Sequence, residues 1–217
     1  MRIEVPGRLM HTYKECFFDQ GYLRKLKFFS VGKPNPVIVD IGANAGYFSL
    51  FMFSRFPGAK ILAYEPVPAN FRLLSKYQAQ NPGLNFLIFP LAVGSESGSI
   101  RLNMDTSNDY TTAASVFSLN GSNESLEVRC TDLLKIFGDN SLGHIDFLKL
   151  DCEGSEYDIL YSASHGVLSR ISCIAMETHS GKSKEQNGES LANYLKQSGF
   201  EVATRPAKVW AWRKNTD

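Results

Sequence analysis

The chain has 217 residues, and its 23 lysines and arginines nearly balance its 22 aspartates and glutamates, which gives a formal net charge of +1. There is no basic stripe, so the composition argues against a nucleic-acid partner. No apolar run approaches the roughly eighteen residues of a membrane-spanning helix, so we expect no membrane insertion. The length suits one domain over residues 1–217, with an N-terminal helical cap (1–34) and an α/β core (35–217).

The four cysteines, Cys16, Cys130, Cys152 and Cys173, lie far apart and form no C-x-x-C pair. This spacing argues against a zinc site and a disulfide framework, and it suits a reducing compartment. Residues 1–10 lack the apolar stretch of a secretion signal. We therefore expect a cytoplasmic protein.

The N-terminal region, residues 7–30, carries apolar residues at intervals in a polar background, which predicts one or two amphipathic helices. Pro34 and Pro36 end this region, because proline cannot continue a helix. Residues 37–41 then form a short apolar run bounded by turn signals, which is typical of a buried parallel strand.

The loop after this strand has the pattern Asp40-x-Gly42-x-Asn44-x-Gly46. It lies at the carboxyl end of a strand and before a helix, where open α/β sheets bind ligands, and its glycines let a ligand approach the backbone. It lacks the third glycine of a dinucleotide motif and the lysine of a phosphate loop. Its first, acidic residue suits a cation, such as the sulfonium and ammonium groups of S-adenosyl-L-methionine (SAM). A tight turn without a ligand is the alternative.

A second strand with an acidic end follows about twenty residues later, at the distance of a ribose-binding acid. Residues 60–64 are apolar and lead into Glu65 and Pro66. A carboxylate only accepts hydrogen bonds, which matches the two hydroxyls of a ribose that both donate. We therefore predict that Glu65 binds a nucleoside ribose, in preference to its being a surface carboxylate before a proline-rich turn.

The remaining pattern alternates between strands and helices. Predicted helices at 46–56 and 67–80 and a strand at 84–89 complete a βαβαβ unit, which indicates a parallel sheet with helices on both faces. Short strands at 98–102 and 126–130 flank a long polar insertion.

The C-terminal half adds two more buried strands, two helices and a closing hairpin. The predicted strands are 145–150 and 171–177, the helices 155–163 and 189–198, and the hairpin strands 200–204 and 209–213. The fold class is therefore α/β, with a Rossmann-like, seven-stranded and mostly parallel sheet whose last strand is antiparallel. An N-terminal helical segment and a polar insertion after the third sheet strand complete it.

A cluster of acidic residues follows the strand at 145–150, where Asp151, Glu153 and Glu156 fall within six residues. This sheet edge faces the same crevice as the two earlier strand ends. Helix capping is an alternative for Glu153 and Glu156, because acids in a first turn favour the helix dipole. Lys149 lies on a buried strand, where an unpaired ammonium is costly, so we expect it to pair with a nearby carboxylate.

The strand at 171–177 ends with Glu177, and His179 follows. Because this strand end should lie beside the previous one, Asp151, Glu153, Glu177 and His179 are predicted to surround one substrate. Carboxylates with a histidine could also hold a divalent metal. The spacing matches no dedicated metal motif, so we predict no metal site.

Together these residues resemble the FkbM family of SAM-dependent methyltransferases, over Val37 to about Glu177. The most specific feature is D-x-E-G-x-E directly after a strand, which separates this family from other methyltransferases. The segments that carry the resemblance are DIGANAGYFSL (40–50), YEPVPANFRLL (64–74), LAVGSESG (91–98), VRCTDLL (128–134) and DFLKLDCEGSEYDIL (146–160).

The resemblance implies a class I methyltransferase fold and the O-methylation of a hydroxyl on a sugar, glycan or macrolide-type small molecule, with S-adenosylhomocysteine as product. It implies that SAM is bound at its methionine end by Asp40, Gly42, Asn44 and Gly46, at its ribose by Glu65 with Pro66 and Asn70 nearby, at its adenine by Leu91 and Ala92, and at its sulfonium by Asp151.

A hydroxyl must lose its proton during methyl transfer, and a positioned acid or histidine can accept it. We expect Asp151 to be the base or an orienting group, with Glu153, Glu177 and His179 as substrate-binding groups or reserve bases. The segments 7–30, 103–125 and 180–188 are candidates for a lid that excludes water.

Three alternatives remain open at this point. A NAD-type oxidoreductase would have a third glycine and a neutral start to its loop, and the pattern from Asp40 to Asn44 argues against it. A SAM-binding protein without catalysis could have the same fold. A methyltransferase acting on protein or RNA is the third, and the balanced charge argues against RNA. The sequence does not predict an oligomeric state.

Overall fold

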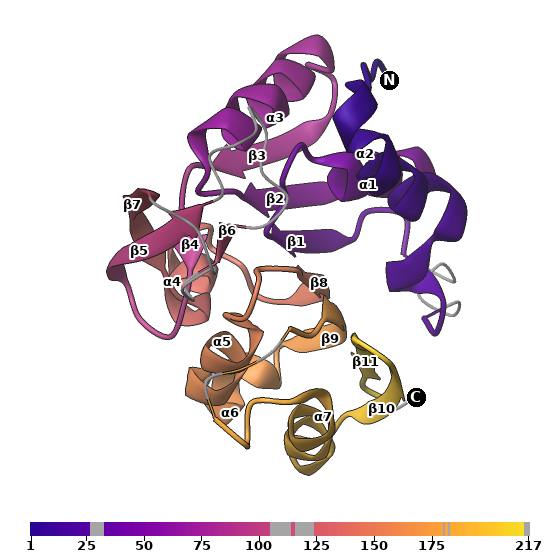
Figure 1. Cartoon of the computed structure of the whole chain (residues 1–217). Helices are drawn as coiled ribbons and strands as arrows, with labels where there is room; N and C mark the ends of the chain where they lie inside the picture. Colours follow the sequence, from indigo (N-terminus) through magenta and orange to yellow (C-terminus); the bar gives the residue numbers. More distant parts are fainter. Residues whose placement is uncertain (27–32, 105–113, 116–123, 180, 182, 215–217) are drawn as a thin grey trace.

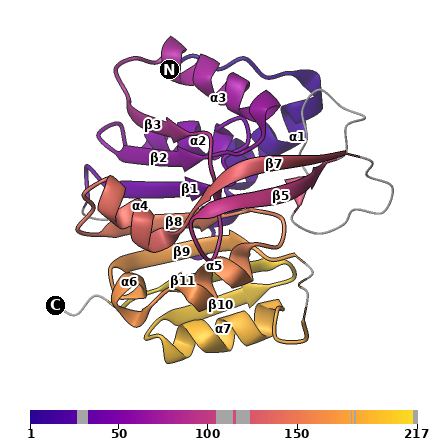
Figure 2. The same ribbon diagram turned by 90° about the vertical axis from the view of Figure 1, so that its left-hand side faces the viewer.

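The structure is a computed structural model that describes residues 1–26, 33–104, 114–115, 124–179, 181 and 183–214. At its centre is a seven-stranded sheet (Figures 1 and 2). In spatial order its strands are β10 (Glu201–Arg205), β11 (Lys208–Trp212), β9 (Ile171–Glu177), β8 (Ile145–Leu150), β1 (Val37–Ile41), β2 (Lys60–Tyr64) and β3 (Asn85–Phe89).

The direction of the strands confirms the predicted fold class. Neighbouring strands from β9 to β3 run parallel, whereas β11 is antiparallel to both β9 and β10. Figure 2 shows the strands stacked in this order, from β3 at the top to β10 at the bottom. The chain order reverses between β1 and β8, which is the switch point where such sheets bind ligands.

Helices cover both faces of the sheet, because side chains along each strand point alternately to opposite faces. Ile38 and Phe147 pack with the N-terminal segment, α2 (Tyr47–Arg55) and α3 (Pro68–Gln80). The helices on the opposite face, which pack over Val39 and Leu148, are α4 (Leu133–Asp139), α5 (Glu156–Ser162), α6 (His165–Leu168) and α7 (Gly188–Gln197). The four-residue α6 was not predicted.

The N-terminal segment is more broken than the one or two helices that we predicted. It consists of four short turns: η1 (Gly7–Leu9), α1 (Met10–Lys14), η2 (Glu15–Asp19) and η3 (Gly21–Leu23). Gln20, with φ 48°, takes a left-handed conformation that a continuous helix does not allow. Residues 27–30 of the predicted range lie outside the described residues.

A second, four-stranded sheet follows β3, in the order β4 (Ala92–Val93), β7 (Glu124–Thr131), β5 (Gly98–Met104) and β6 (Ala114–Ser115). The predicted short strands at 98–102 and 126–130 are confirmed within β5 and β7, which pair antiparallel. The sequence did not predict that they form a separate sheet. Most of the candidate lid at 103–125 lies outside the described residues, as do positions 180 and 182.

In the part of the chain that the structure describes, the helices are too short or too polar to cross a lipid bilayer.

Candidate active site

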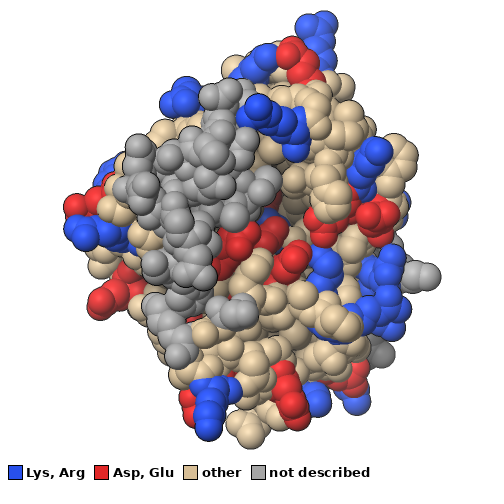
Figure 3. Space-filling model, in the orientation of Figure 1, with Lys and Arg blue, Asp and Glu red and all other residues tan. Residues whose placement is uncertain are grey.

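A cavity of about 450 Å³ opens at the carboxyl ends of the central strands. Its volume is typical of sites for small molecules. Figure 3 shows acidic side chains gathered in the hollow at the centre of this face. The sequence-predicted residues that line the cavity are Gly42, Asn44, Glu65, Pro66, Asn70, Leu91, Ala92, Asp151, Glu153, Glu177 and His179.

Gly42 joins the loop after β1 to the end of β8. Its φ is 72°, and a Cβ atom at this position would lie 1.8 Å from the carbonyl oxygen of Asp151. The amides of Gly42 and Ala43 both donate to the carbonyl oxygen of Tyr64, each at 3.0 Å. Because only glycine allows this contact, the loop is held between the ends of β2 and β8.

Two residues of the predicted SAM-binding loop lie behind the cavity wall. Asp40 is fully buried, and its Oδ2 accepts a 2.7 Å hydrogen bond from Ser49 of α2. Gly46 packs against Leu74 of α3, where a Cβ would come within 2.4 Å of the leucine side chain. Neither residue lines the cavity, and both hold the loop through contacts with α2 and α3.

Lys149 is the partner of Asp40, with 3.2 Å between its Nζ and the Asp40 Oδ1, and it lies 3.8 Å from Asp151 Oδ2. Burial opposes its charge, but the charges of Asp40 and Asp151 outweigh this effect and hold the pKa of Lys149 above its usual range. Its Nζ also donates to the carbonyl oxygen of Gly42 at 2.7 Å. The expected pairing of Lys149 is therefore confirmed, chiefly with a carboxylate on the neighbouring strand.

Glu65 follows β2 as a buried carboxylate in the cavity wall. Its Oε2 accepts from the amide of Asn44 and its Oε1 from the amide of Val67, both at 2.8 Å. Burial raises the pKa of Glu65 to about 7, although these hydrogen bonds oppose the shift. Oε1 also accepts a longer, 3.5 Å hydrogen bond from Nδ2 of Asn70, whereas Oε2 has a further lone pair that can accept from a ligand hydroxyl.

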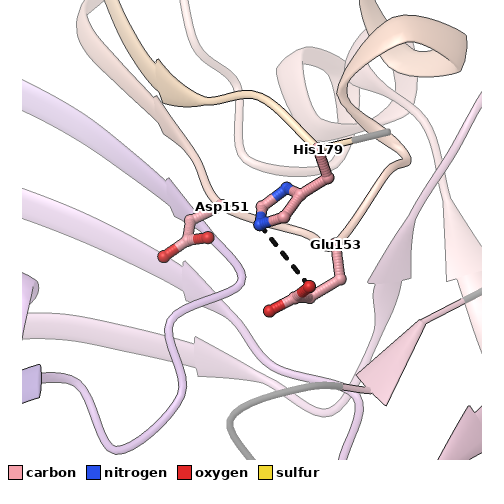
Figure 4. Close-up of side chains that lie close together, drawn as sticks. All are labelled: Asp151, Glu153 and His179. Atoms are coloured by element: carbon pink, nitrogen blue, oxygen red, sulfur yellow. Dashed lines mark ion pairs between the residues drawn. The ribbon is translucent and has the colours of Figure 1, made fainter. Parts of the chain in front are cut away.

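Asp151, Glu153 and His179 lie close together in the cavity, and the ring of His179 points toward Glu153 (Figure 4). Nε2 of His179 is 3.5 Å from Glu153, and Nδ1 is 2.9 Å from the buried Glu156. Burial would lower the pKa of His179, but the hydrogen bond and charge of Glu156, reinforced by Glu153 and Asp151, raise it to about 9. His179 is therefore a cation at neutral pH.

Glu153 and Glu156 differ in their surroundings. Burial raises the pKa of Glu153 to about 7, an effect that His179 partly opposes. Such a pKa suits a group that exchanges a proton at neutral pH. Glu156 accepts from the amides of Cys152 and Gly154 at 3.1 and 3.0 Å, so it closes the turn before α5. It lies in the first turn of α5, as the helix-dipole alternative expected, whereas Glu153 precedes the helix.

The same three cavity residues are the group that could hold a metal ion. Among the described residues, Asp151, Glu153 and His179 offer ligand atoms that lie within 4.8 Å of one another. A metal needs the neutral imidazole, so it would have to displace the proton that the surrounding acids hold on His179.

Glu177 also lines the cavity, where Lys208 Nζ lies 2.9 Å from its carboxylate. Lys208 Nζ is also 2.8 Å from Glu15 of the N-terminal segment. The sequence predicted a lid from this segment but none of its individual contacts. The missed cavity residues that lie outside the segments of the family resemblance are Arg8, His11, Thr12, Glu15, Cys16 and Tyr22 from the N-terminal segment and Ile100 and Leu102 from β5. No local pattern marks them, because they reach the cavity through long-range packing.

The comparisons with known proteins agree with this geometry. The family model described as the methyltransferase FkbM domain matches residues 40–202. The methyltransferase sdnD of Sordaria araneosa is 29% identical over 228 residues, which cover 92% of this chain and 84% of that protein. The 31-O-demethyl-FK506 methyltransferase FkbM of Streptomyces tacrolimicus is 26% identical over 232 residues, with 94% and 86% covered.

Two further matches involve longer proteins. The AMB antimetabolite synthetase AmbE of Pseudomonas aeruginosa is 28% identical over 230 residues, which cover 90% of this chain but only 11% of the synthetase. The solved structure of methyltransferase FkbM from Methylobacillus flagellatus superposes with a TM-score of 0.61 at 15% identity, and the match covers 92% of this chain and 47% of that chain. This likeness shows the shared fold.

Proposed function

Because this chain belongs to the FkbM family of methyltransferases, we propose that it transfers the methyl group of SAM to a hydroxyl group of a small-molecule or glycan acceptor. The observation that carries this proposal is the placement of Glu65 and of the cluster Asp151, Glu153 and His179 in one cavity. One end suits a nucleoside, and the other offers a proton acceptor.

The chemistry of the cavity residues fits SAM. Glu65, fixed by two backbone amides, would accept hydrogen bonds from the ribose hydroxyls. Leu91 and Ala92 would flank the adenine, with Pro66 and Asn70 near the ribose. Gly42 and Asn44 would hold the methionine end of SAM. Asp40 and Gly46, which lie behind the cavity wall, would fix the conformation of the loop. Asp151 would face the positive sulfonium.

When bound, SAM supplies an electrophilic methyl group, so the task of the chain is mainly to align the acceptor and to accept its proton. We assign the base to Glu153, because its pKa of about 7 matches the operating pH. Asp151 would orient the acceptor, and His179, as a cation, would stabilise the ionised Glu153. Glu177, held by Lys208, would bind the acceptor.

The acceptor end of the cavity favours a neutral or hydroxyl-rich molecule. The carboxylates of Glu15, Asp151, Glu153 and Glu177 line the cavity together with Arg8, Lys149 and His179, so the cavity has no excess of positive charge that would attract a phosphate or a nucleic-acid backbone. The name of the Streptomyces tacrolimicus relative specifies the transfer of a methyl group to a 31-O-demethyl form of FK506. Both observations support an oxygen acceptor on a small molecule.

Two further features bear on the domain organisation and the location of the protein. The N-terminal segment supplies part of the cavity wall, which supports a single domain over residues 1–217. All four cysteines are free thiols, which supports a cytoplasmic location.

The experiment is incubation of the purified protein with SAM and a panel of sugar and macrolide acceptors. We expect S-adenosylhomocysteine to form in step with an acceptor that gains one methyl group on oxygen. Product formation only on an amine or carbon acceptor would contradict the assignment to a hydroxyl. Product formation that persists at full rate in Glu153→Gln would place the base elsewhere.

A further inference from the structure

Tyr22 comes from the N-terminal segment, outside the residues 40–202 that the family model matches. Its hydroxyl donates a 2.8 Å hydrogen bond to Asp151 Oδ2, across 129 positions of the chain. We propose that Tyr22 is a positioning residue that sets the orientation of the Asp151 carboxylate for methyl transfer. This inference rests on the proposed function.

The tyrosine hydroxyl is a permanent donor at this position. Tyr22 is only 4% exposed. Burial, together with the negative charge of Asp151, raises its pKa well above the usual value. It therefore keeps its proton at neutral pH, and it donates to the carboxylate.

The ring of Tyr22 is fixed from several sides, so the hydroxyl has little freedom to move. Phe48 of α2 packs edge-on at 5.4 Å between ring centroids. The ammonium groups of Lys208 and Lys149 lie 4.7 and 5.5 Å from the ring centroid. The backbone is held as well, because Trp210 Nε1 donates to the carbonyl oxygen of Tyr22 at 3.1 Å.

Among the described residues, the hydrogen bond and the ion pair of the Asp151 carboxylate involve the same oxygen. Oδ2 accepts from Tyr22 and lies 3.8 Å from Lys149 Nζ, whereas the described residues give Oδ1 no hydrogen-bond partner. Oδ1 therefore remains for a ligand in the cavity. Without the tyrosine hydroxyl, Lys149 would be the main partner, and the carboxylate would turn toward it. A misplacement of this kind costs catalysis more than binding.

The test is Tyr22→Phe, which removes the hydroxyl and keeps the ring. Tyr77→Phe is the matched control, because Tyr77 is also fully buried, its hydroxyl donates to the carbonyl of Glu4, and it does not line the cavity. We expect Tyr22→Phe to lower kcat about ten- to hundredfold with SAM affinity within about threefold. The control should keep the wild-type kcat.

A double-mutant cycle with Asp151→Asn separates positioning from a direct contact with the acceptor. If Tyr22 acts through Asp151, Tyr22→Phe should change kcat little in the Asp151→Asn background. Additive losses, or an unchanged kcat in the single variant, would overturn the proposal.

Crystal structures of the wild type and Tyr22→Phe provide a readout that needs no activity. We expect the Asp151 carboxylate to turn toward Lys149 in the variant, and an unchanged carboxylate would overturn the proposal. If the wild type methylates none of the acceptors, the proposed function fails, and this comparison still decides the role of Tyr22.

Discussion

Lys149 and Asp40 are direct neighbours in the parallel register of β8 and β1, and their charged atoms are 3.2 Å apart. Lys149 is 3% exposed and Asp40 fully buried, so each depends on the other for compensation of its charge. Lys149 also holds the carbonyl oxygen of Gly42. We infer that the first acid of the loop motif acts on the ligand indirectly, by fixing Lys149 and through it the loop.

Asp40→Asn should therefore destabilise the fold, and not only the binding of a ligand. Removing one partner of a buried ion pair typically costs about 3–5 kcal/mol, because the other charge stays buried. Urea unfolding followed by circular dichroism measures this loss. The double variant Asp40→Leu with Lys149→Met is the control and should lose less stability. A wild-type unfolding midpoint in Asp40→Asn would contradict the dependence of Lys149 on Asp40.

Much of the fold could be predicted because its strands are marked locally. The apolar runs at 37–41, 60–64 and 145–150 are buried strands, and the acids at two of their ends, Glu65 and Asp151, meet in one cavity. Each strand is predicted from a few consecutive residues, and the shared cavity follows because ligands bind at the carboxyl ends of parallel strands.

The direction of Asp40 could also have been inferred from the sequence. It stands two residues after Ile38, so both side chains point to the sheet face that α2 covers. A buried lysine at position 149 was the second signal, because such a charge needs a buried partner. Tyr22 carried no such signal. Its contact with Asp151 depends on how the N-terminal segment packs, which no local pattern encodes.

Glu65→Gln should weaken SAM binding about 10- to 100-fold, because hydrogen bonds to a charged group contribute roughly 1.5–3 kcal/mol. The amide also brings a donor into a site where the amides of Asn44 and Val67 already donate. Calorimetric titration with SAM measures the change. Glu189→Gln, at an exposed position of α7, is the matched control. Equal SAM affinity in Glu65→Gln and in the control would show that Glu65 does not bind SAM.

The affinity for SAM should depend on pH through Glu65. Its pKa is about 7, and the ionised form accepts hydrogen bonds from the ribose better than the protonated form does. Affinity should therefore fall as the pH drops below 7, by at most about tenfold per pH unit for a single proton. Titrations between pH 5.5 and 8.5 test this, and Glu65→Gln should show a flatter profile. An identical profile in both proteins would assign the pH dependence to another group.

The raised pKa of Glu65 makes the stability of the fold depend on pH in the opposite direction to the affinity for SAM. The pKa of Glu65 rises from 4.5 to about 7 on folding, so the folded protein binds this proton more tightly than the unfolded chain. Its contribution to stability is fully present below pH 4.5 and is lost as the pH rises through 7. The unfolding free energy of the wild type minus that of Glu65→Gln should fall over this range.

Glu153→Gln should lower kcat by about 10²–10⁴-fold, because it removes the proposed base, while SAM affinity stays within about tenfold. The wild-type rate should rise with pH through about 7, where Glu153 loses its proton, and this limb should disappear in the variant. Initial rates of S-adenosylhomocysteine formation at several pH values measure both effects. Asp151→Asn, which keeps Glu153, should retain the limb at a reduced rate. A limb that survives in Glu153→Gln would move the base to another residue.

A crystal structure of the protein soaked with S-adenosylhomocysteine tests the central claim most directly. We predict that the two ribose hydroxyls lie within hydrogen-bond distance of Glu65 and that the sulfur atom lies beside Asp151. A product molecule bound elsewhere, or a cavity that stays empty at saturating concentration, would contradict the account.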